Sequence, residues 1–389
     1  MTGWNSKFGA RIPVDDVVPV FGGYVEAPWT GHTRRLPLSH HYVFDTMRND
    51  SAVGIDVIND KSSDGWQLPY ERYPFATCEL GAGLQSTHHR RVAVSGMDAY
   101  GLSLVKLGCG NNLIGYYMYH GGTNKIGKLS TLNESRATGY PNDYPVLNYD
   151  FHTALSQYGE TREQYRLLNL LHLFVNDFGD VLAPMENVES EQPVSENDLE
   201  SLRYSMRTDG TSGFVFVNHY QRLAELKDVR DAVIDTGIVK FPAIDVCGKI
   251  CFFFPFRFSL GEVTLEYATA QPLCRIVNTY FFTAIEGINP EYCFSDGTIF
   301  HDRDFYINGK NTRIITLSFD EARFARKLSG KLYIGDGCDV YECGGQICAV
   351  QNGSFSYRVW NGKEFEKVQT NIDFRNAEAE FETVEEPFI

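Results

Sequence analysis

The stretch that decides the fold begins with FATCELG at residues 75–81 and ends with LIGYYMYHGGTN at residues 113–124. Both segments open with a short apolar run and finish in glycines and polar residues, as buried strands of parallel sheets do. Between them, Ser95 and Asp98 have the spacing of a helix cap and its N3 acid, and apolar residues continue until Gly108. The sequence therefore predicts strands at 75–79 and 113–119 with a helix at about 95–107 between them.

A second helix is predicted from about Thr161 to Phe178, because apolar residues there form one broad face and Gly179 follows. The order strand, helix, strand, helix is typical of a parallel α/β arrangement. In such folds the functional residues gather where the strands end. Residues 1–185 are thus expected to form an α/β domain with its site after residues 79 and 119.

The chain changes character near residue 186. Residues 186–200, ENVESEQPVSENDLE, are acidic and lack aromatic side chains, which favours a solvated linker. Beyond it, residues 201–389 are predicted to form an antiparallel β-sandwich region, because short β-patterned runs alternate with turn sequences such as Asp209-Gly210 and Asn361-Gly362. The expected strands lie at 214–217, 250–258, 263–267, 279–284, 312–319, 331–334 and 356–360.

Composition narrows the possible partners and compartment. A formal charge of -15 disfavours binding to nucleic acid or to anionic membranes, and no apolar run reaches the ~18 residues that a spanning helix needs. The nine cysteines are scattered, which favours a reducing, cytoplasmic compartment over a disulfide framework. The five-residue spacing of Cys338, Cys343 and Cys348 does not match zinc motifs, so no metal is predicted.

Two features point to carbohydrate chemistry. Glu79 ends an apolar run and precedes glycines, so its carboxylate is open to act as a nucleophile, although a carboxylate in this position more often caps a helix or forms an ion pair. The second run carries Tyr117 and then His120 and Asn124, and aromatic rings beside polar groups suit the apolar faces and hydroxyls of a sugar. The alternative is that these tyrosines belong to the core.

The segment YMYHGGTN at residues 117–124, followed by NYDFHTAL at residues 148–155 and then Gly159, resembles the family 35 glycoside hydrolases, the β-galactosidases. Residues 78–81, CELG, are similar to the nucleophile strand of that family, and the likeness covers roughly residues 1–295. Two departures are that Phe151 stands where the family commonly has a second Tyr, and that glycines follow Glu79 instead of large aromatics.

The resemblance implies a carbohydrate-active hydrolase that cleaves terminal β-galactosides with retention and without a cofactor. Glu79 corresponds to the nucleophile, and Tyr117, Tyr149, Asn124 and His120 to the substrate site. The acid/base of the family is a Glu in an Asn-Glu pair on an earlier barrel strand, and residues 1–78 contain no Asn-Glu. The one such pair nearby, Asn133-Glu134, follows the second strand and is out of the family order, so the alternative is a surface loop.

The first residues resemble the end of the sixth strand of a (β/α)8 TIM barrel, so this chain is expected to hold only the last barrel strands, followed by the β-sandwich. The expected partners are a β-galactoside and either the missing N-terminal half of the barrel or a second copy of the chain. The competing hypothesis is a catalytically inactive fragment, or remnant, that binds carbohydrate without cleaving it, because the acid is lacking.

Overall fold

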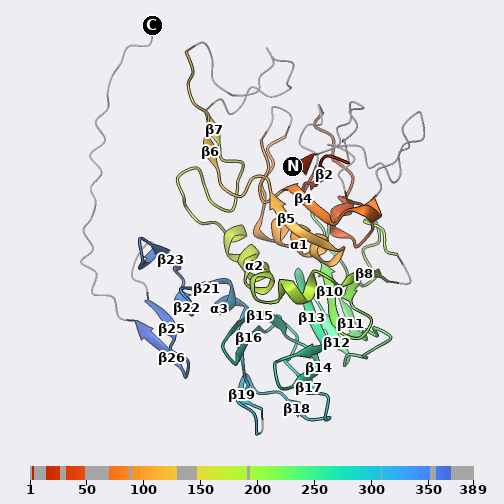
Figure 1. The fold of residues 1–389 in the computed structure, drawn as a ribbon. Helices are drawn as coiled ribbons and strands as arrows, with labels where there is room; N and C mark the ends of the chain where they lie inside the picture. The colour runs from red at the N-terminus through yellow and green to blue at the C-terminus, as the bar shows by residue number, and fades with distance from the viewer. Residues whose placement is uncertain are drawn as a thin grey trace.

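The computed structural model describes residues 2–3, 15–26, 32–48, 70–86, 90–128, 147–190, 193–307, 309–350 and 356–368 of the 389-residue chain. This described part is mostly β-structure with few helices, and most of its sheets are antiparallel, as a β-sandwich region requires (Figure 1).

The α/β part is built on a three-stranded parallel sheet. Its strands are β3 (Phe21–Gly23), β4 (Phe75–Leu80) and β5 (Asn111–Tyr116), in that order. Helix α1 (Gly96–Gly108) connects β4 to β5, and α2 (Glu163–Leu182) packs on α1. The strand, helix, strand, helix order is therefore confirmed, and the three strands end at one edge of the sheet.

Local sequence explains where α1 begins and which face of α2 is buried. Ser95 accepts from the backbone N–H of Asp98 while the Asp98 carboxylate accepts from Ser95, which is a capping box. In α2, Leu167, Leu171 and Phe174 are buried on one face, which packs against α1 and the sheets below.

The largest sheet has seven antiparallel strands. From edge to edge they are β18 (Ile299–Phe300), β17 (Tyr292–Phe294), β14 (Thr264–Ala268), β13 (Ile250–Ser259), β10 (Gly213–His219), β9 (Tyr204–Thr208) and β8 (Glu186–Glu189). One face lies against α1 and α2, where Phe174 contacts Phe214 and Phe253 with ring centroids 5.1 and 4.4 Å apart. The other face lies under the hairpin of β11 (Val229–Ala232) and β12 (Ile244–Val246).

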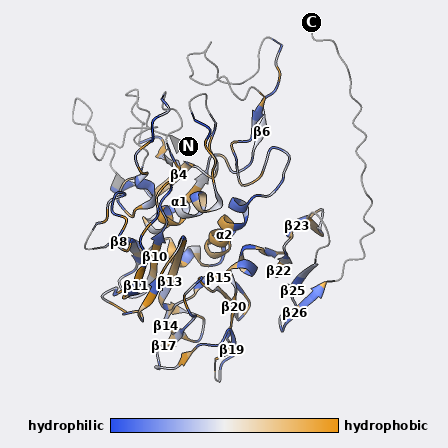
Figure 2. Ribbon diagram, turned by 180° about the vertical axis from the view of Figure 1, so that it is seen from behind, coloured by the Kyte–Doolittle hydropathy of each residue, from blue (hydrophilic) through white to orange (hydrophobic). Residues whose placement is uncertain are grey.

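Because both faces are covered, the central strands are apolar along most of their length; the exceptions include Asn218 and His219 at the end of β10 and Arg257 near the end of β13. Phe214 and Phe216 belong to the core shared with the helices, whereas Val215 and Val217 belong to the core under β11 and β12. Figure 2 shows apolar colour along much of both strands. The first core extends from the parallel sheet, through both helices, to the C-terminal sheets, so it joins these layers.

The remaining elements are short. There are two four-stranded sheets. The strands of the first are, in order, β15 (Gln271–Ile276), β16 (Thr279–Thr283), β20 (Arg313–Leu317) and β19 (Asp304–Tyr306). The strands of the second are, in order, β21 (Ala325–Leu328), β22 (Lys331–Asp336), β25 (Ser356–Trp360) and β26 (Phe365–Val368). Two-stranded pairs are formed by β1 (Thr2–Gly3) with β2 (Val18–Pro19), β6 (Gly122–Thr123) with β7 (Asn148–Tyr149), and β23 (Asp339–Cys343) with β24 (Gln346–Val350). The short helices are η1 (His40–Tyr42), η2 (Tyr70–Arg72) and α3 (Phe319–Arg323).

Three segments differ from the sequence prediction. The stretch expected as a linker starts as strand β8, which pairs with β9 at the sheet edge, where charged side chains are common. The strand expected to reach Phe319 ends at Leu317, because Ser318 and Glu321 form a capping box that starts α3. The segment 113–119 is predicted as a buried strand, but residues 113–116 are exposed or half-buried, and the strand ends at Tyr116, so Tyr117 and the residues after it leave the sheet.

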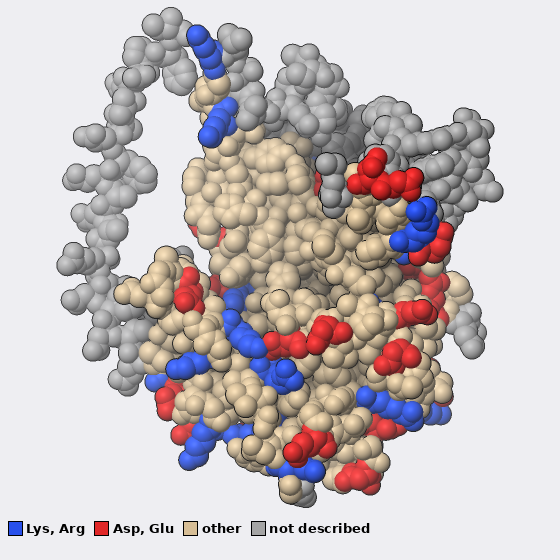
Figure 3. Space-filling view, viewed as in Figure 1, with Lys and Arg blue, Asp and Glu red and all other residues tan. Residues whose placement is uncertain are grey.

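Charges of both signs are interspersed over the C-terminal sheets on the face seen in Figure 3, and much of the described surface above them is uncharged. All nine cysteines are free thiols. Within the described ranges, no helix is long and apolar enough to cross a bilayer.

Candidate active site

The candidate site lies at the edge where the three parallel strands end. Glu79 is the last residue but one of β4, Tyr24 follows β3, and Tyr117 follows β5. The backbone bonds that continue past the strands hold these residues together: Gly81 N–H donates to Gly23 O at 2.8 Å, and Tyr117 N–H donates to Leu80 O at 3.0 Å. Residues far apart in the chain thus meet where α/β folds build their sites.

Tyr24 is the direct partner of Glu79. Its phenol donates a hydrogen bond to Glu79 Oε2, and the Tyr24 side chain is almost fully buried. Gly81 allows this approach, because a Cβ at Gly81 would lie 3.1 Å from the Tyr24 ring. Tyr24 therefore fixes the Glu79 carboxylate through a hydrogen bond to one of its two oxygens, Oε2.

Burial dominates the electrostatics of the pair. It raises the pKa of the half-buried Glu79 carboxyl above its usual value, and the hydrogen bond from Tyr24 opposes part of that shift. Burial and the adjacent Glu79 raise the pKa of Tyr24 well above its usual value, so the phenol remains a donor at neutral pH. Burial, with Glu79 as the second cause, also raises the pKa of the Cys78 thiol to about 11, so this thiol stays neutral.

An aromatic group adjoins this pair. The hydroxyls of Tyr117 and Tyr149 are hydrogen-bonded to each other, and the ring of Phe151 lies 4.2 Å from that of Tyr149 and 6.3 Å from that of Tyr117. Tyr117 also contributes to the raised pKa of Tyr24, which links the aromatic group to the carboxylate pair. The structure therefore brings together the predicted residues Glu79, Tyr117 and Tyr149.

The glycines after Glu79 have a steric role. A Cβ at Gly83 would overlap the carbonyl oxygen of Phe151, and the next residue, Leu84, donates its N–H to that same oxygen at 2.6 Å. A large side chain at residue 83 would push the Phe151 segment away. This packing explains why small residues follow Glu79 in this chain.

The other two predicted residues lie on the adjoining segment. His120 is exposed, its ring Nδ1 contacts the carbonyl of Gly121, and its backbone pairs with Leu155. Asn124 is half-buried and donates its backbone N–H to Leu147 O at 2.7 Å, beside the β6–β7 pair. In the described part of the chain, no interaction joins His120 to Glu79 or to the aromatic group.

Two other carboxylates in this region are held by arginines. Glu26, two residues after Tyr24, pairs with Arg90 at 3.2 Å and with Arg222 at 3.0 Å. Asp150 pairs with Arg162 at 2.7 Å and accepts two backbone N–H groups. Both are therefore structural partners. Asn133-Glu134, the alternative acid, lies outside the described residues.

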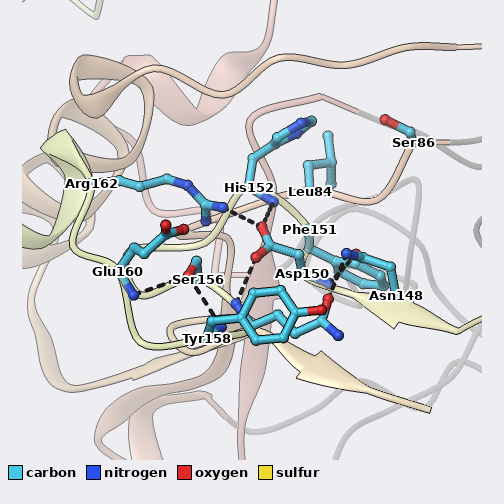
Figure 4. A pocket seen from close by; sticks show the side chains of 11 residues that line it. Leu84, Ser86, Asn148, Asp150, Phe151, His152, Ser156, Tyr158, Glu160 and Arg162 are labelled. Atoms are coloured by element: carbon cyan, nitrogen blue, oxygen red, sulfur yellow. Dashed lines mark hydrogen bonds and ion pairs between the residues drawn. The ribbon is translucent and has the colours of Figure 1, made fainter. Parts of the chain in front are cut away.

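A polar cavity of about 490 Å³ opens beside the aromatic group (Figure 4). Phe151 lines it together with the loop after β4 and the connection from β7 to α2. Asp150 lies at its centre, with the Arg162 guanidinium facing its carboxylate. Among the described residues, no group of three or more His, Cys, Asp or Glu side chains is placed to hold a metal ion.

Sequence reasoning missed Tyr24 as a site residue. The sequence does contain a signal for Tyr24, which follows two glycines at the end of a short apolar run, as a residue after a strand does. Because adjacent parallel strands end at the same edge of a sheet, a tyrosine in that position would lie near Glu79. Phe151 was noted only as a departure from a motif, although its ring packs on both tyrosines of the site.

Comparison with known proteins provides no assignment: no protein-family model matches the chain, and no curated protein is significantly similar to it.

Proposed function

We propose that this chain is the β-galactosidase-type part of a retaining glycoside hydrolase, with Glu79 as the nucleophile. The observation that carries the proposal is the Glu79 carboxylate at the strand edge, where Tyr24 binds it and where Tyr117, with its partners Tyr149 and Phe151, follows the neighbouring strand. A carboxylate beside aromatic rings suits a pyranose, whose apolar C–H face lies on a ring while its anomeric carbon meets the nucleophile.

In this mechanism Glu79 attacks the anomeric carbon and forms a glycosyl ester, which water then hydrolyses. Tyr24 orients the carboxylate through its hydrogen bond to Oε2. The leaving oxygen needs a proton from a second carboxylic acid about 5–5.5 Å from the nucleophile. We assign that role either to Glu134 or to a carboxyl that this chain does not contain.

The proposal includes the fold and the setting. We assign β3, β4 and β5, with α1 as the crossover, to the last part of a (β/α)8 barrel. A complementary barrel half or a second copy of the chain would complete it. We also propose a cytoplasmic location, for which the nine free thiols are the support.

A second candidate is a carbohydrate-binding protein that cleaves no bond. The observation in its favour is that Glu26 and Asp150, the carboxylates nearest the site in the chain, are both engaged by arginines. Without a proton donor, the aromatic group still binds a sugar, but the leaving group is not protonated.

Covalent labelling separates the two candidates. Incubating the chain with 2-deoxy-2-fluoro-β-galactosyl fluoride is expected to add one fluorogalactosyl group to Glu79, located by peptide mass spectrometry. Fluoride leaves without protonation, so labelling tests the nucleophile independently of the acid. The matching glucosyl fluoride is the specificity control. If Glu79 stays unmodified at saturating reagent while a galactoside still binds, the result would favour the second candidate, a carbohydrate-binding protein.

Tyr24→Phe is expected to move the acidic limb of the labelling rate to higher pH. The hydrogen bond from Tyr24 lowers the raised pKa of Glu79, so its loss raises that pKa further, and the nucleophile must be ionised to react.

Tyr267→Phe is the matched control, because Tyr267 also donates to a glutamate, Glu291, at 2.6 Å, but on the seven-stranded sheet. Its labelling profile should coincide with that of the unmodified chain. An unchanged acidic limb in Tyr24→Phe would show that Tyr24 does not set the ionisation of Glu79.

A further inference from the structure

The cavity adjoins the aromatic group of the candidate active site through one shared residue, Phe151. Phe151 lines the cavity, and its ring packs 4.2 Å from that of Tyr149, which is hydrogen-bonded to Tyr117. A ligand longer than one sugar could therefore contact both the tyrosines and the cavity. The volume of about 490 Å³ falls within the range of about 300–1,000 Å³ that is usual for small-molecule sites.

Tyr158 is the most unusual residue of its wall. The side chain lines the cavity, yet 83% of Tyr158 is exposed, and the residue belongs to no apolar cluster of the described chain. In Figure 4 its ring lies across the front of the cavity, before Asp150. An aromatic ring displayed at the mouth of a polar cavity is a stacking surface for the C–H face of a sugar.

The interior of the cavity is preorganised. Asp150 accepts from Arg162 at 2.7 Å, from His152 N–H at 3.1 Å and from Gln157 N–H at 2.7 Å. The amide of Asn148 donates to Gln157 Oε1 at 2.6 Å. These bonds fix the loop before any ligand arrives, so binding costs little ordering entropy.

The polar groups select a neutral ligand. Arg162 is occupied by Asp150 and by the carbonyl of Thr153 at 2.8 Å, so it has little capacity to bind an anion. No described residue donates a hydrogen bond to the Glu160 carboxylate, which points into the cavity in Figure 4. A free acceptor beside an exposed ring suits the hydroxyls of a neutral sugar and repels phosphates and carboxylates.

We infer that this cavity binds the sugar on the leaving-group side of the scissile bond, stacked on Tyr158 and hydrogen-bonded to Glu160. The natural substrate is then a β-galactosyl oligosaccharide. This inference rests on the proposed function for the class of ligand, and it adds which part of the substrate is recognised and by which residues.

The test compares the binding of lactose and methyl β-galactoside to the full chain by titration calorimetry. Tyr158→Ala is expected to weaken lactose binding about fivefold to tenfold, because it removes the ring on which the sugar stacks. Glu160→Gln, which keeps the shape but removes the charge, should weaken it by a similar factor. Both variants should affect methyl β-galactoside less than lactose.

Tyr306→Ala is the matched control, because Tyr306 is also exposed, at 53%, and lies on β19 at the far end of the molecule (Figure 1). Lactose affinities of Tyr158→Ala and Glu160→Gln that stay within twofold of this control would overturn the inference. If Glu79 is labelled by the fluoride reagent in that case, the proposed function stands without the cavity. If Glu79 is not labelled but both variants lose lactose selectively, the cavity stands and hydrolysis does not.

Discussion

Replacing Arg207 by Met is expected to lower the free energy of unfolding by about 3 kcal/mol, because hydrogen bonds from a charged group are worth about 1.5–3 kcal/mol each and several are lost. Arg207 is 1% exposed and lies on β9 in the seven-stranded sheet. No described carboxylate forms an ion pair with it. Burial lowers the pKa of its guanidinium to about 10, so the group is still charged at neutral pH.

The ends of both long helices balance this charge. Arg207 donates to Leu107 O at 3.5 Å, at the end of α1, and to Leu182 O at 2.9 Å, at the end of α2. It also donates to Met185 O at 3.1 Å and to Asn112 Oδ1 at 2.7 Å. Carbonyls in the last turn of a helix have no partner within the helix and carry partial negative charge. Met would remove the Arg207 donors from the Met185 carbonyl and would leave Leu107 O and Leu182 O with the backbone N–H groups of Gly110 and Met185.

Urea unfolding of the two proteins measures the loss. Arg230→Met is the matched control, because Arg230 is exposed and pairs with Asp228 and Asp245 on the surface, where removing an ion pair has little effect on stability. Arg207→Lys should recover only part of the stability, since one ammonium cannot span both helix ends. A change in Arg207→Met no larger than that of the control would contradict this role.

The elements that the sequence predicted correctly carry their own local signals. The Ser95 and Asp98 capping box starts α1, and the apolar stripe of Leu167, Leu171 and Phe174 marks α2. The turns at Asp209-Gly210 and Asn361-Gly362 do connect strand pairs, β9 with β10 and β25 with β26. Each of these signals depends on residues within a few positions of one another, so a single sequence contains it.

The features that the sequence did not predict depend on distant contacts. Tyr24 and Glu79 are 55 residues apart, and Arg207 meets the end of α1 across 100 residues. Nothing near Arg207 distinguishes it from an exposed arginine on a β-strand. Strand β8 has a linker composition and becomes a strand because β9 offers it an open edge. Such partners are set by packing, which local propensity does not encode.

Glu79→Gln is expected to abolish labelling by the fluoride reagent and to lower any galactoside turnover by on the order of 10⁴-fold or more, because an amide cannot replace the nucleophile. The same change is expected to raise the melting temperature at neutral pH. Burial raises the pKa of Glu79, so its ionised form is less stable in the folded chain than in the unfolded one.

The pH dependence of this effect has a definite sign. Below the unfolded pKa of about 4.3 the carboxyl is protonated in both states, and Glu and Gln should be nearly equivalent. As the pH rises through the higher pKa of the folded state, Glu79 ionises in its buried position and the wild type loses stability that the Gln variant keeps. The difference in melting temperature should therefore grow as the pH rises from the unfolded pKa to the raised folded pKa of Glu79, and stay constant above it.

Glu321→Gln is a control with the opposite expectation. Burial favours a higher pKa for Glu321, but hydrogen bonds from Arg358 and from the Ser318 cap outweigh it, and the net pKa is lowered. Replacing the Glu321 carboxylate by an amide should therefore destabilise the chain at neutral pH. This effect should fade as the pH falls through the lowered pKa of Glu321. If Glu79→Gln instead lowers the melting temperature at pH 7, as Glu321→Gln should, then contacts hold Glu79 ionised and it is an ordinary structural carboxylate. Opposite responses would identify Glu79 as the destabilised carboxylate that a functional site retains for its chemistry.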